Sequence, residues 1–401
     1  MPAPLAGIKV VEIASFVAVP AAGALLADLG AEVVKVEVPW GEIYRHSSPR
    51  LMGIEHDFPA APPFQMDNRG KRSLGMDLAL PQAQEALRRV IDGADVVITN
   101  VLPARLVKYG LDPETLRAAR PELVFARLSG FGGDGDRAND PAFDYTAFWA
   151  MSGLMDHLHD RDAAPGWMRP GVGDHSASMA MVVGILAALR MRDATGEGQV
   201  VDVSLQQIGH YINGNDMAYA LATGEQPPYH DRRAPRNPLW NHYPTQDGRW
   251  LFLVMIDSDR YWPLLARAIG RPELARDERF KGAIERFKNN RELAALLEEV
   301  FLARTLEAWG EALASERLIW APVRTLVEAS RDANAAKSGM FPTVEHPDYG
   351  VFRTVAPPVR MSAHEMTGGT AAPTLAADTA AVLAEAGVDD ETIALIVASS
   401  S

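Results

Sequence analysis

The stretch that decides the fold runs over residues 8–37 and reads IKVVEIASFVAVPAAGALLADLGAEVVKVE. Apolar, β-rich runs at residues 8–13 and 32–37 flank an Ala- and Leu-rich segment at residues 20–29. A proline near the start of that segment and Gly30 just after its end are typical of a helix. The stretch therefore predicts a strand, a helix and a second strand parallel to the first.

The same alternation continues through the first third of the chain. Helices are predicted over residues 81–91 and 113–119, and strands over residues 96–99 and 123–128. Strands and helices that alternate through short joints indicate an α/β fold with a doubly wound parallel sheet. Residues 40–65 are rich in proline and lack a clear period, which predicts a functional loop.

A buried helix and a smaller α+β region follow. Residues 179–189 are apolar on most sides, which indicates a buried helix that begins at Asp174. Residues 224–239 are polar and rich in Pro and Arg, which is typical of a linker. The remaining predicted elements are a strand at 200–203, a hairpin with strands at 241–245 and 250–254 around Asp247-Gly248, and helices at 260–269, 291–302, 306–313, 380–385 and 391–397.

The composition excludes several classes of protein. The chain has 401 residues, 47% of them hydrophobic, no cysteine, and 39 Lys and Arg against 52 Asp and Glu, so its net charge is −13. This content excludes a disordered chain, disulfides, thiolate metal sites and a cysteine nucleophile. The negative charge argues against nucleic acid and anionic membranes as partners, because both attract basic surfaces. No basic segment leads into an apolar run at the N-terminus, and runs such as residues 179–189 are too short to span a bilayer, so we expect a cytoplasmic protein.

Several common active sites are missing. Residues 14–20, after the first predicted strand, lack the Gly-x-Gly-x-x-Gly pattern of dinucleotide-binding turns. The absence of a Gly-x-x-x-x-Gly-Lys-Ser/Thr loop and of a Gly-x-Ser-x-Gly elbow argues against kinase-like proteins and serine hydrolases. The run Asp156 to Asp160 (DHLHD), with Asp162 close by, has metal-ligand residues, but ligands two positions apart do not share a helix face. We expect a solvated acidic loop there and no metal.

Asp174 lies in a segment that suits a reactive carboxylate. Residues 171–175 read GVGDH and come directly before the buried helix. An aspartate at this place can be an N-cap, which accepts a hydrogen bond from an early helix amide. It can equally be a nucleophile, because the helix N-terminus keeps it ionised and the glycines let a substrate carbonyl approach. The spacing alone leaves both roles open.

Short motifs in a fixed order extend over nearly the whole chain. They are residues 5–10 (LAGIKV), 29–37 (LGAEVVKVE), 68–73 (NRGKRS), 94–100 (ADVVITN), 129–132 (SGFG), 173–174 (GD) and 195–199 (TGEGQ). In these motifs the chain resembles the class III CoA-transferases, the CaiB/BaiF family. The resemblance implies a Rossmann-like large domain completed by the C-terminal tail, a smaller inserted α+β domain, and an interlocked homodimer. We expect large-domain residues 1–223, a linker at 224–239, a small domain at 240–330, and a linker with return to the large domain at 331–401.

The resemblance places Asp174 where the family has its catalytic aspartate. It implies that CoA passes from an acyl-CoA donor to a carboxylic acid acceptor through aspartyl anhydride and aspartyl thioester intermediates. Covalent intermediates conserve the energy of the thioester, so the transfer needs no ATP. CoA and acyl-CoA are then substrates, and no tightly bound cofactor is expected.

The expected CoA contacts come partly from charge and partly from the resemblance. Arg69, Lys71 and Arg72 form the densest positive cluster in the N-terminal part of the chain, which suits phosphates or, alternatively, a solvated surface. Some family members have an arginine where this chain has Val38, so Arg45 or Arg105 is a possible replacement. The resemblance implies CoA contacts at Phe16, Val17, Ala18, Lys71, Arg72, Asn100, Lys108 and Tyr109.

Alternatives to a CoA-transferase remain open at this point. Racemases of 2-methylacyl-CoA in the same family carry a His-Asp pair where this chain has Phe143-Asp144-Tyr145, and Phe143 cannot transfer a proton. His175 or His157 is a conceivable substitute, but residues adjacent on a helix diverge by about 100°, so we expect His175 to be structural. A catalytically idle CoA-ester-binding protein is the other alternative, which the presence of Asp174 disfavours. The nearby apolar side chains, which predict either an acyl pocket or packing in the core or a dimer interface, are Trp40, Trp149, Met151 and Trp167.

Overall fold

The computed structural model describes residues 2–159, 163–366 and 368–399. The chain divides into two compact units. Unit 1 comprises Met1–Asp156, Trp167–Glu225 and Ala333–Ser401, and unit 2 comprises His157–Gly166 and Gln226–Asp332. The domain boundaries expected from the sequence stay a prediction.

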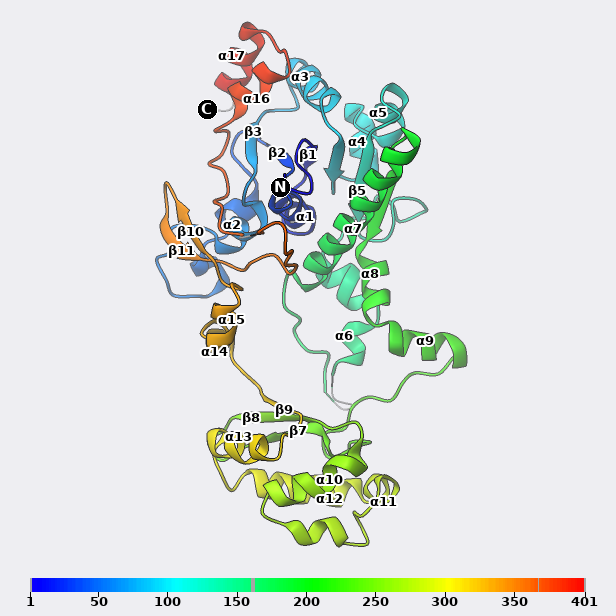
Figure 1. Ribbon diagram of the computed structural model, residues 1–401. Coiled ribbons are helices and arrows are strands. Elements are labelled where there is room, and N and C mark those ends of the chain that lie inside the picture. Colours follow the sequence, from blue (N-terminus) through cyan, green and yellow to red (C-terminus); the bar gives the residue numbers. More distant parts are fainter. Residues whose placement is uncertain (1, 160–162, 367, 400–401) are drawn as a thin grey trace. The chain divides into compact units, whose positions relative to one another are not determined.

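Unit 1 is built on a six-stranded parallel sheet (Figure 1). Its strands are β1 (Lys9–Ile13), β2 (Glu32–Glu37), β3 (Arg72–Gly75), β4 (Val96–Thr99), β5 (Val124–Ser129) and β6 (Val200–Ser204). The strand order is β3-β2-β1-β4-β5-β6, so the order reverses between β1 and β4. In sheets of this kind, ligands bind outside the carboxyl ends of the strands at the point of reversal.

Helices cover both faces of this sheet. They include α1 (Ala18–Asp28), α3 (Pro81–Asp92), α7 (Val172–Thr195), α16 (Thr379–Glu385) and α17 (Asp390–Ser399). Successive strand side chains point to opposite faces, so Val10 packs in a core with α1 and α7 while Val11 packs in another with α3, α16 and α17. The C-terminal tail therefore returns to the sheet of unit 1, as Figure 1 shows.

Most elements predicted in the N-terminal third are confirmed. The bounds of β2, β4 and α5 (Pro113–Ala119) are as predicted, and those of β1, β5, α1 and α3 differ by one or two residues. The segment 40–65 is not a plain loop, because it contains the short helices η1 (Ile43–His46) and η2 (Pro49–Met52) and the start of α2 (Pro62–Asn68). Helices as short as α2 and α4 (Pro103–Tyr109) produce no clear 3.6-residue period, so the pattern missed them.

The long helix α7 is the centre of one core of unit 1. By length and composition alone it is apolar enough to cross a membrane. Its side chains Ala177, Met181 and Ile185 are buried in the core beside α1, so α7 is a core helix in this fold. The other elements of unit 1 are η3 (Tyr145–Ala150), α6 (Leu154–His157) at the boundary of the units, α8 (Leu205–Ile212), α9 (Gly214–Thr223), α15 (Ala333–Lys337), and the antiparallel pair β10 (Thr343–His346) and β11 (Gly350–Arg353).

Unit 2 has an antiparallel sheet and its own core. The predicted hairpin is confirmed as β7 (Trp240–Pro244) and β8 (Trp250–Val254), and β9 (Trp320–Pro322) pairs with β8. The large side chains Trp262, Phe301 and Trp309 are buried in this core. Its helices are α10 (Ser258–Ala268), η4 (Pro272–Arg276), α11 (Ala283–Lys288), α12 (Asn290–Phe301), α13 (Leu306–Ser315) and α14 (Leu326–Ser330).

Candidate active site

The turn between β1 and α1 is fixed by hydrogen bonds at consecutive residues. Asn100, which follows β4, accepts a hydrogen bond from the backbone N–H of Ser15 at 3.3 Å and donates one to the Ser15 carbonyl at 2.7 Å. Glu42 accepts the backbone N–H of Phe16 at 2.5 Å. Phe16 has a φ of 67°, in the left-handed region that few residues other than glycine adopt. The turn is therefore held in an unusual conformation at the carboxyl edge of the sheet.

A cavity of about 410 Å³ opens beside this turn. It lies at the carboxyl ends of β1 and β2 and beside α4, which is the position where a doubly wound sheet binds its ligand. Of the predicted CoA contacts, Phe16, Arg105 and Tyr109 line the cavity, and Val38 lines it too. Arg105 and Lys108 are exposed on α4, and neither forms an ion pair within the described residues. They are the cations of this region that remain available to a phosphate.

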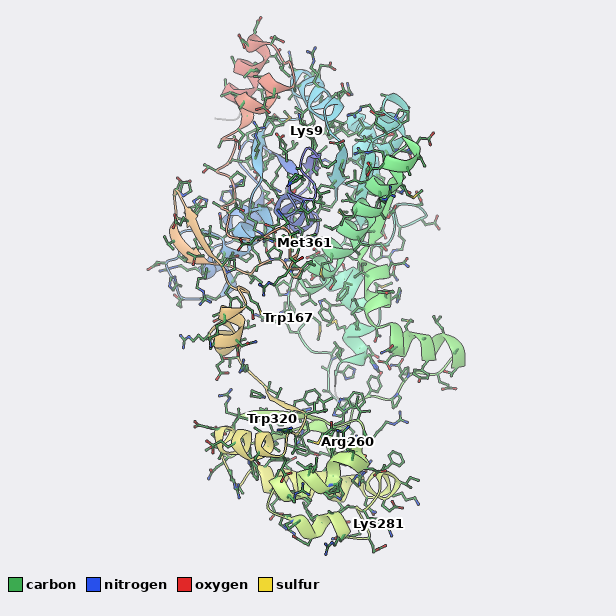
Figure 2. All side chains as sticks on the ribbon, viewed as in Figure 1. Lys9, Trp167, Arg260, Lys281, Trp320 and Met361 are labelled. Atoms are coloured by element: carbon green, nitrogen blue, oxygen red, sulfur yellow. The ribbon has the colours of Figure 1, made fainter. Side chains whose placement is uncertain are left out.

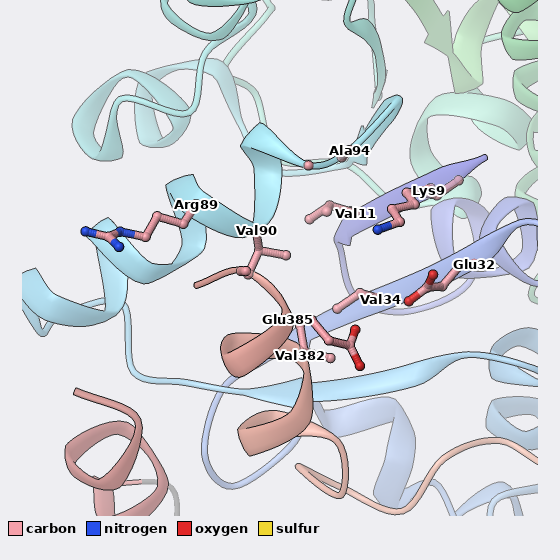
Figure 3. A pocket seen from close by; sticks show the side chains of 12 residues that line it. Lys9, Val11, Glu32, Val34, Arg89, Val90, Ala94, Val382 and Glu385 are labelled. Carbon is pink, nitrogen blue, oxygen red and sulfur yellow. The ribbon is translucent and has the colours of Figure 1, made fainter. Parts of the chain in front are cut away.

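A second, much smaller cavity lies at the opposite edge of the sheet. Figure 3 shows it between β1, β2, α3 and α16, where Lys9 and Glu32 are the first residues of their strands. Its volume is about 70 Å³, whereas ligand pockets usually exceed about 300 Å³. The cavity beside Phe16 is the candidate ligand site because it is large enough and also lies at the carboxyl ends of the strands.

Asp174 occupies the first turn of α7. The helix begins at Val172 and its N-cap is Gly171, so it starts earlier than predicted. Gly171 has a φ of 83°, and a Cβ atom at position 173 would collide with the ring of Phe148. Both positions therefore require glycine. The result is a half-buried carboxylate close to the positive end of the helix.

A different aspartate satisfies the N-terminus of α7. Asp144, which is 3% exposed, accepts the backbone N–H of Gly171 at 2.8 Å, and the N–H of Gly173 also acts on its carboxylate. The N-cap position is Gly171, and within the described residues the Asp174 side chain makes no capping hydrogen bond. The N-cap role that the sequence left open for Asp174 is therefore wrong, because the N-cap is Gly171 and Asp144 supplies the acceptor. The carboxylate of Asp174 remains available for chemistry.

The surroundings of Asp174 raise its pKa to about 7. Burial is the largest cause, and the negative charges of Asp144 and Asp67 act in the same direction. The positive charge of His175 opposes them and lowers the pKa of Asp174. A carboxylate with a pKa near neutrality is more basic than an ordinary one and is still partly ionised at pH 7, as a nucleophile requires.

His175 is held by a buried carboxylate. Its Nε2 lies 3.0 Å from Oδ1 of Asp67 in α2, and Asp67 is 1% exposed. Burial disfavours the imidazolium, but the hydrogen bond and charge of Asp67 outweigh it and raise the pKa of His175. Burial also raises the pKa of Tyr44, and the charges of Asp67 and Asp174 raise it further. His175 thus has an electrostatic effect on Asp174 that the expectation of a structural histidine did not include.

Aromatic contacts link the fixed turn to the aspartates. The rings of Phe16 and Phe143 meet edge to face with centroids 5.3 Å apart, and Phe143 directly precedes Asp144. Trp167, labelled in Figure 2, is 80% exposed, and its ring lies 5.5 Å from that of Tyr145. These side chains form an apolar wall near the start of α7. Phe143 carries no proton to transfer, so this position offers no racemase-type His-Asp pair.

Arg69 and Lys71 of the predicted basic cluster do not form an open surface. Arg69 pairs with Asp28 at 2.6 Å, and both side chains are almost fully buried. Lys71 is buried and pairs with Glu12 at 2.7 Å. Each cation already has a carboxylate partner inside the protein. The expected basic patch is therefore buried and paired at these two residues.

Arg72 and Arg45 are also engaged. Arg72 is the first residue of β3, at the amino edge of the sheet, and pairs with Glu32 and Glu385 at 2.7 Å each. That edge is opposite to the cavity beside Phe16. Arg45 pairs with Glu37 at 2.6 Å and is 10% exposed. Arg45 and Arg105 are the two candidates for the cation that some family members have at the position of Val38. Of these two, only Arg105 lines the cavity, and it has no ion-pair partner in the described part of the chain.

The remaining predicted positions divide between core and surface. Val17 and Ala18 are buried at the start of α1, and Trp149 is buried against Phe148. Trp40 lines the cavity and Met151 is exposed. Trp149 therefore packs in the core, whereas Trp40 is placed to contact a ligand.

The acidic run at residues 156–162 is only partly described. Asp160 and Asp162 lie outside the described residues. The ring of His159 stacks on Tyr229 with centroids 5.1 Å apart. Across residues 2–159, 163–366 and 368–399, no group of three or more His, Asp or Glu side chains could hold a metal ion.

Known proteins share both the sequence and the fold. A family model described as CoA-transferase family III matches residues 5–379. The chain belongs to CoA-transferase family III. The cinnamoyl-CoA:phenyllactate CoA-transferase of Clostridium sporogenes is 30% identical over 402 residues, covering 96% of this chain and 94% of that protein. The (R)-2-hydroxy-4-methylpentanoate CoA-transferase of Clostridioides difficile is 30% identical over 395 residues, covering 97% of each.

A solved structure supports the same assignment for this CoA-transferase. The crystal structure of a CaiB/BaiF family protein from Brucella suis matches with a TM-score of 0.85 and 31% identity, covering 96% of this chain and 100% of that one. The predicted family, the α/β fold class and the transfer of CoA are confirmed. The enzyme acts on CoA thioesters.

The sequence did not reveal Glu42, Asp67, Tyr44 or Asp144 as parts of the site. Asp144 lies in the segment Phe143-Asp144-Tyr145, where the sequence alone indicates only that a histidine is missing. Glu42, Tyr44 and Asp67 lie in the proline-rich segment or just after it, and no local pattern marks them. Their roles depend on contacts with residues far away in the sequence.

Proposed function

We propose that this enzyme moves CoA from an acyl-CoA donor to a carboxylic acid through covalent intermediates on Asp174. The Asp174 carboxylate attacks the thioester carbonyl, the C–S bond breaks, and CoA thiolate leaves behind an acyl-aspartyl anhydride. The thiolate then attacks the aspartyl carbonyl and releases the donor's acid, which leaves an aspartyl-CoA thioester. The acceptor carboxylate attacks that thioester to give a new anhydride and thiolate, and the thiolate finally takes the acceptor's acyl group and frees Asp174.

One observation carries this proposal: a carboxylate at the start of α7 that caps nothing and has a pKa of about 7. A capping carboxylate would be occupied by backbone amides, and an ordinary one would be a weaker base. The first-turn position also favours the anion through the helix dipole, which assists ionisation against burial.

We propose the cavity beside Phe16 as the site of the CoA nucleotide. Arg105 and Lys108 would face its phosphates, and Tyr109 and Trp40 its adenine ring. Asn100, Val17 and Ala18 would shape the turn from β1 and α1. Arg69 and Lys71 would stabilise the protein interior, where both are paired, and Arg72 would hold the C-terminal helix α16 at the amino edge of the sheet.

The acceptor is proposed to be a monocarboxylic acid with an apolar side chain. The relatives named above act on phenyllactate and on 2-hydroxy-4-methylpentanoate, which are acids of this kind. The exposed rings of Phe143 and Trp167 near the start of α7 suit such a side chain. A panel of acyl-CoA donors with aromatic, branched and dicarboxylic acceptors tests the class, and preferred transfer to dicarboxylates would contradict it.

A homodimer, interlocked as the resemblance implies, and a cytoplasmic location remain proposals. The support for a dimer is apolar surface on unit 1: Met179, Val183 and Leu186 of α7 and Leu221 of α9 are exposed, and α9 buries none of its residues. Surface of this kind usually marks an interface. Analytical ultracentrifugation tests it, and a monomer at micromolar concentration would contradict it.

Trapping tests the covalent mechanism. Incubation with acyl-CoA, treatment with hydroxylamine or borohydride, and mass spectrometry should show modification on the peptide that contains Asp174. Asp174→Ala and Asp174→Asn should lose the adduct and lower kcat by several orders of magnitude while the fold persists. Turnover by Asp174→Ala at the wild-type rate, with no adduct in the wild type, would exclude the mechanism.

A further inference from the structure

A chain of buried charges runs beneath the turn that contains Phe16. Nζ of Lys71 lies 2.7 Å from Oε2 of Glu12, and Nζ of Lys35 lies 2.9 Å from Oε1 of the same carboxylate. Lys35 also pairs with Oε1 of Glu42 at 2.8 Å. The other oxygen of Glu42, Oε2, accepts the backbone N–H of Phe16 at 2.5 Å. Alternating charges thus connect the core to one specific backbone amide.

Stability alone does not explain this arrangement. Lys71, Lys35 and Glu12 have fully buried side chains, and Glu42 is 8% exposed. Taking charges out of water is so unfavourable that apolar residues of similar volume often serve a fold as well or better. A buried ion chain does, however, fix the relative positions of the groups at its two ends.

Both ends of this series of ion pairs form hydrogen bonds with backbone groups. At one end Lys71 donates to the carbonyl of Pro20 in α1 at 2.8 Å and to the carbonyl of Asp67 in α2 at 3.0 Å. In the middle Lys35 donates to the carbonyl of Ala14 at 3.1 Å. At the other end is Phe16, which is one of the few non-glycine residues at positive φ in the described chain. An outlier of this kind persists only where its surroundings enforce it.

We propose that Glu42 is a positioning residue, which holds Phe16 in its left-handed conformation and thereby sets the wall shared by the CoA cavity and the Asp174 region. This inference rests on the proposed use of the cavity for CoA. Phe16 lines the cavity and meets Phe143 at 5.3 Å, and Phe143 precedes the aspartate that binds the N-terminus of α7. Without the carboxylate, the Phe16 amide loses its acceptor and the turn relaxes away from this wall.

The test measures binding of CoA itself by isothermal titration calorimetry in a double-mutant cycle. Glu42→Ala should weaken binding about tenfold, the effect expected when a hydrogen bond to a charged group is lost. Glu42→Gln should recover much of the affinity, since its amide oxygen can still accept the N–H of Phe16. In a Phe16→Gly background, Glu42→Ala should weaken binding less than about twofold further, because glycine adopts a positive φ without help.

Controls separate positioning from general damage. Glu122→Ala removes a glutamate that pairs with Arg120 at 2.9 Å away from the cavity, and it should leave CoA binding unchanged. Thermal unfolding of each variant reports its stability. If Glu42→Ala does not fold, Glu42→Gln measured with and without the Phe16→Gly substitution gives the same coupling with smaller amplitude.

The outcomes distinguish the two proposals. Wild-type protein that does not bind CoA, or Arg105→Ala with unchanged affinity, would overturn the cavity as the CoA site and this inference with it. If Arg105→Ala weakens binding but Glu42→Ala does not, only the role of Glu42 falls. An equal loss from Glu42→Ala with and without the Phe16→Gly substitution would also overturn it, since Glu42 would then act through the fold in general.

Discussion

Nε2 of His175 lies 3.0 Å from Oδ1 of Asp67, and the residue before His175 is the proposed nucleophile Asp174. The Asp67 side chain is 1% exposed, whereas that of His175 is 40% exposed. The pair joins α2 to the first turn of α7 and sets a positive charge among the carboxylates of Asp67, Asp144 and Asp174. The ionisation of Asp174 should therefore depend on the charge of His175.

We expect the acidic limb of the pH profile of kcat/KM to lie near pH 7, because Asp174 must be ionised to attack and its pKa is about 7. His175→Gln removes the charge that lowers this pKa, so the limb should move to higher pH by about one unit. The remaining groups that act on Asp174, which are Asp67, Asp144 and Tyr44, provide no compensating positive charge.

His242→Gln, in β7 of unit 2, is the matched control and should leave the limb in place. A limb that stays at the wild-type pH in His175→Gln would show that His175 has no effect on the nucleophile. A limb near pH 4 in the wild type would show that burial does not raise the pKa of Asp174.

Asp174→Asn should stabilise the protein at pH 8. The pKa of Asp174 is raised from 3.8 to about 7 in the folded state, so the folded state binds the proton more tightly than the unfolded state does. Stability is then lost as pH rises from about 4 to about 7, and an asparagine does not suffer this loss. We expect a gain of about 1 kcal/mol in the free energy of unfolding at pH 8, allowing for solvent screening of a half-buried group, and almost none at pH 4.

Urea unfolding at the two pH values measures this difference. Asp140→Asn, a change of the same kind on the surface of unit 1, should show no such pH dependence. Equal stability of Asp174→Asn and wild type at pH 8 would mean that the surroundings of Asp174 do not disfavour its ionised form.

Much of the fold was predictable because its signals are local. The bounds of β2 follow from an apolar run that begins two residues after Gly30, and α3 begins at a proline. Short helices such as α2 and α4 have too few residues for a period to emerge. Unit boundaries depend on contacts across the chain, and the sequence pattern alone does not contain them.

The site was predictable only in part, for the same physical reason. Asp174 stands in a local Gly-Val-Gly-Asp segment that makes it a candidate, although the segment alone does not decide between an N-cap and a nucleophile. Its electrostatic partner Asp67 is 108 positions from His175, and Asp144 is 27 positions from the amide that it binds. The charge of Lys71 suggested phosphate binding, but its surroundings, which no local pattern encodes, make it an interior cation.

Asp144 should affect both stability and the pH profile. Asp144→Ala leaves the Gly171 amide without its acceptor, so we expect a loss of about 1–2 kcal/mol in the free energy of unfolding, as for a lost helix cap. Asp144→Asn keeps an oxygen acceptor and should lose less. It also removes a negative charge that raises the pKa of Asp174, so its acidic limb should move to lower pH, opposite to His175→Gln. Limbs that move in the same direction in both variants would contradict this electrostatic account.

Arg105 and Lys108 should carry the salt dependence of CoA binding. Both are exposed on α4 without ion-pair partners in the described chain, so each is free to meet a phosphate. Arg105→Ala should raise the Kd for CoA by roughly tenfold at low salt, and the double variant with Lys108→Ala should raise it further. Because ion pairs are screened by salt, the difference from wild type should shrink at high ionic strength.

Arg137→Ala, which removes an exposed arginine paired with Asp140, is the control and should bind CoA as the wild type does. If Arg105→Ala and Lys108→Ala bind CoA normally at every salt concentration, the phosphates contact other residues and the nucleotide does not occupy this cavity.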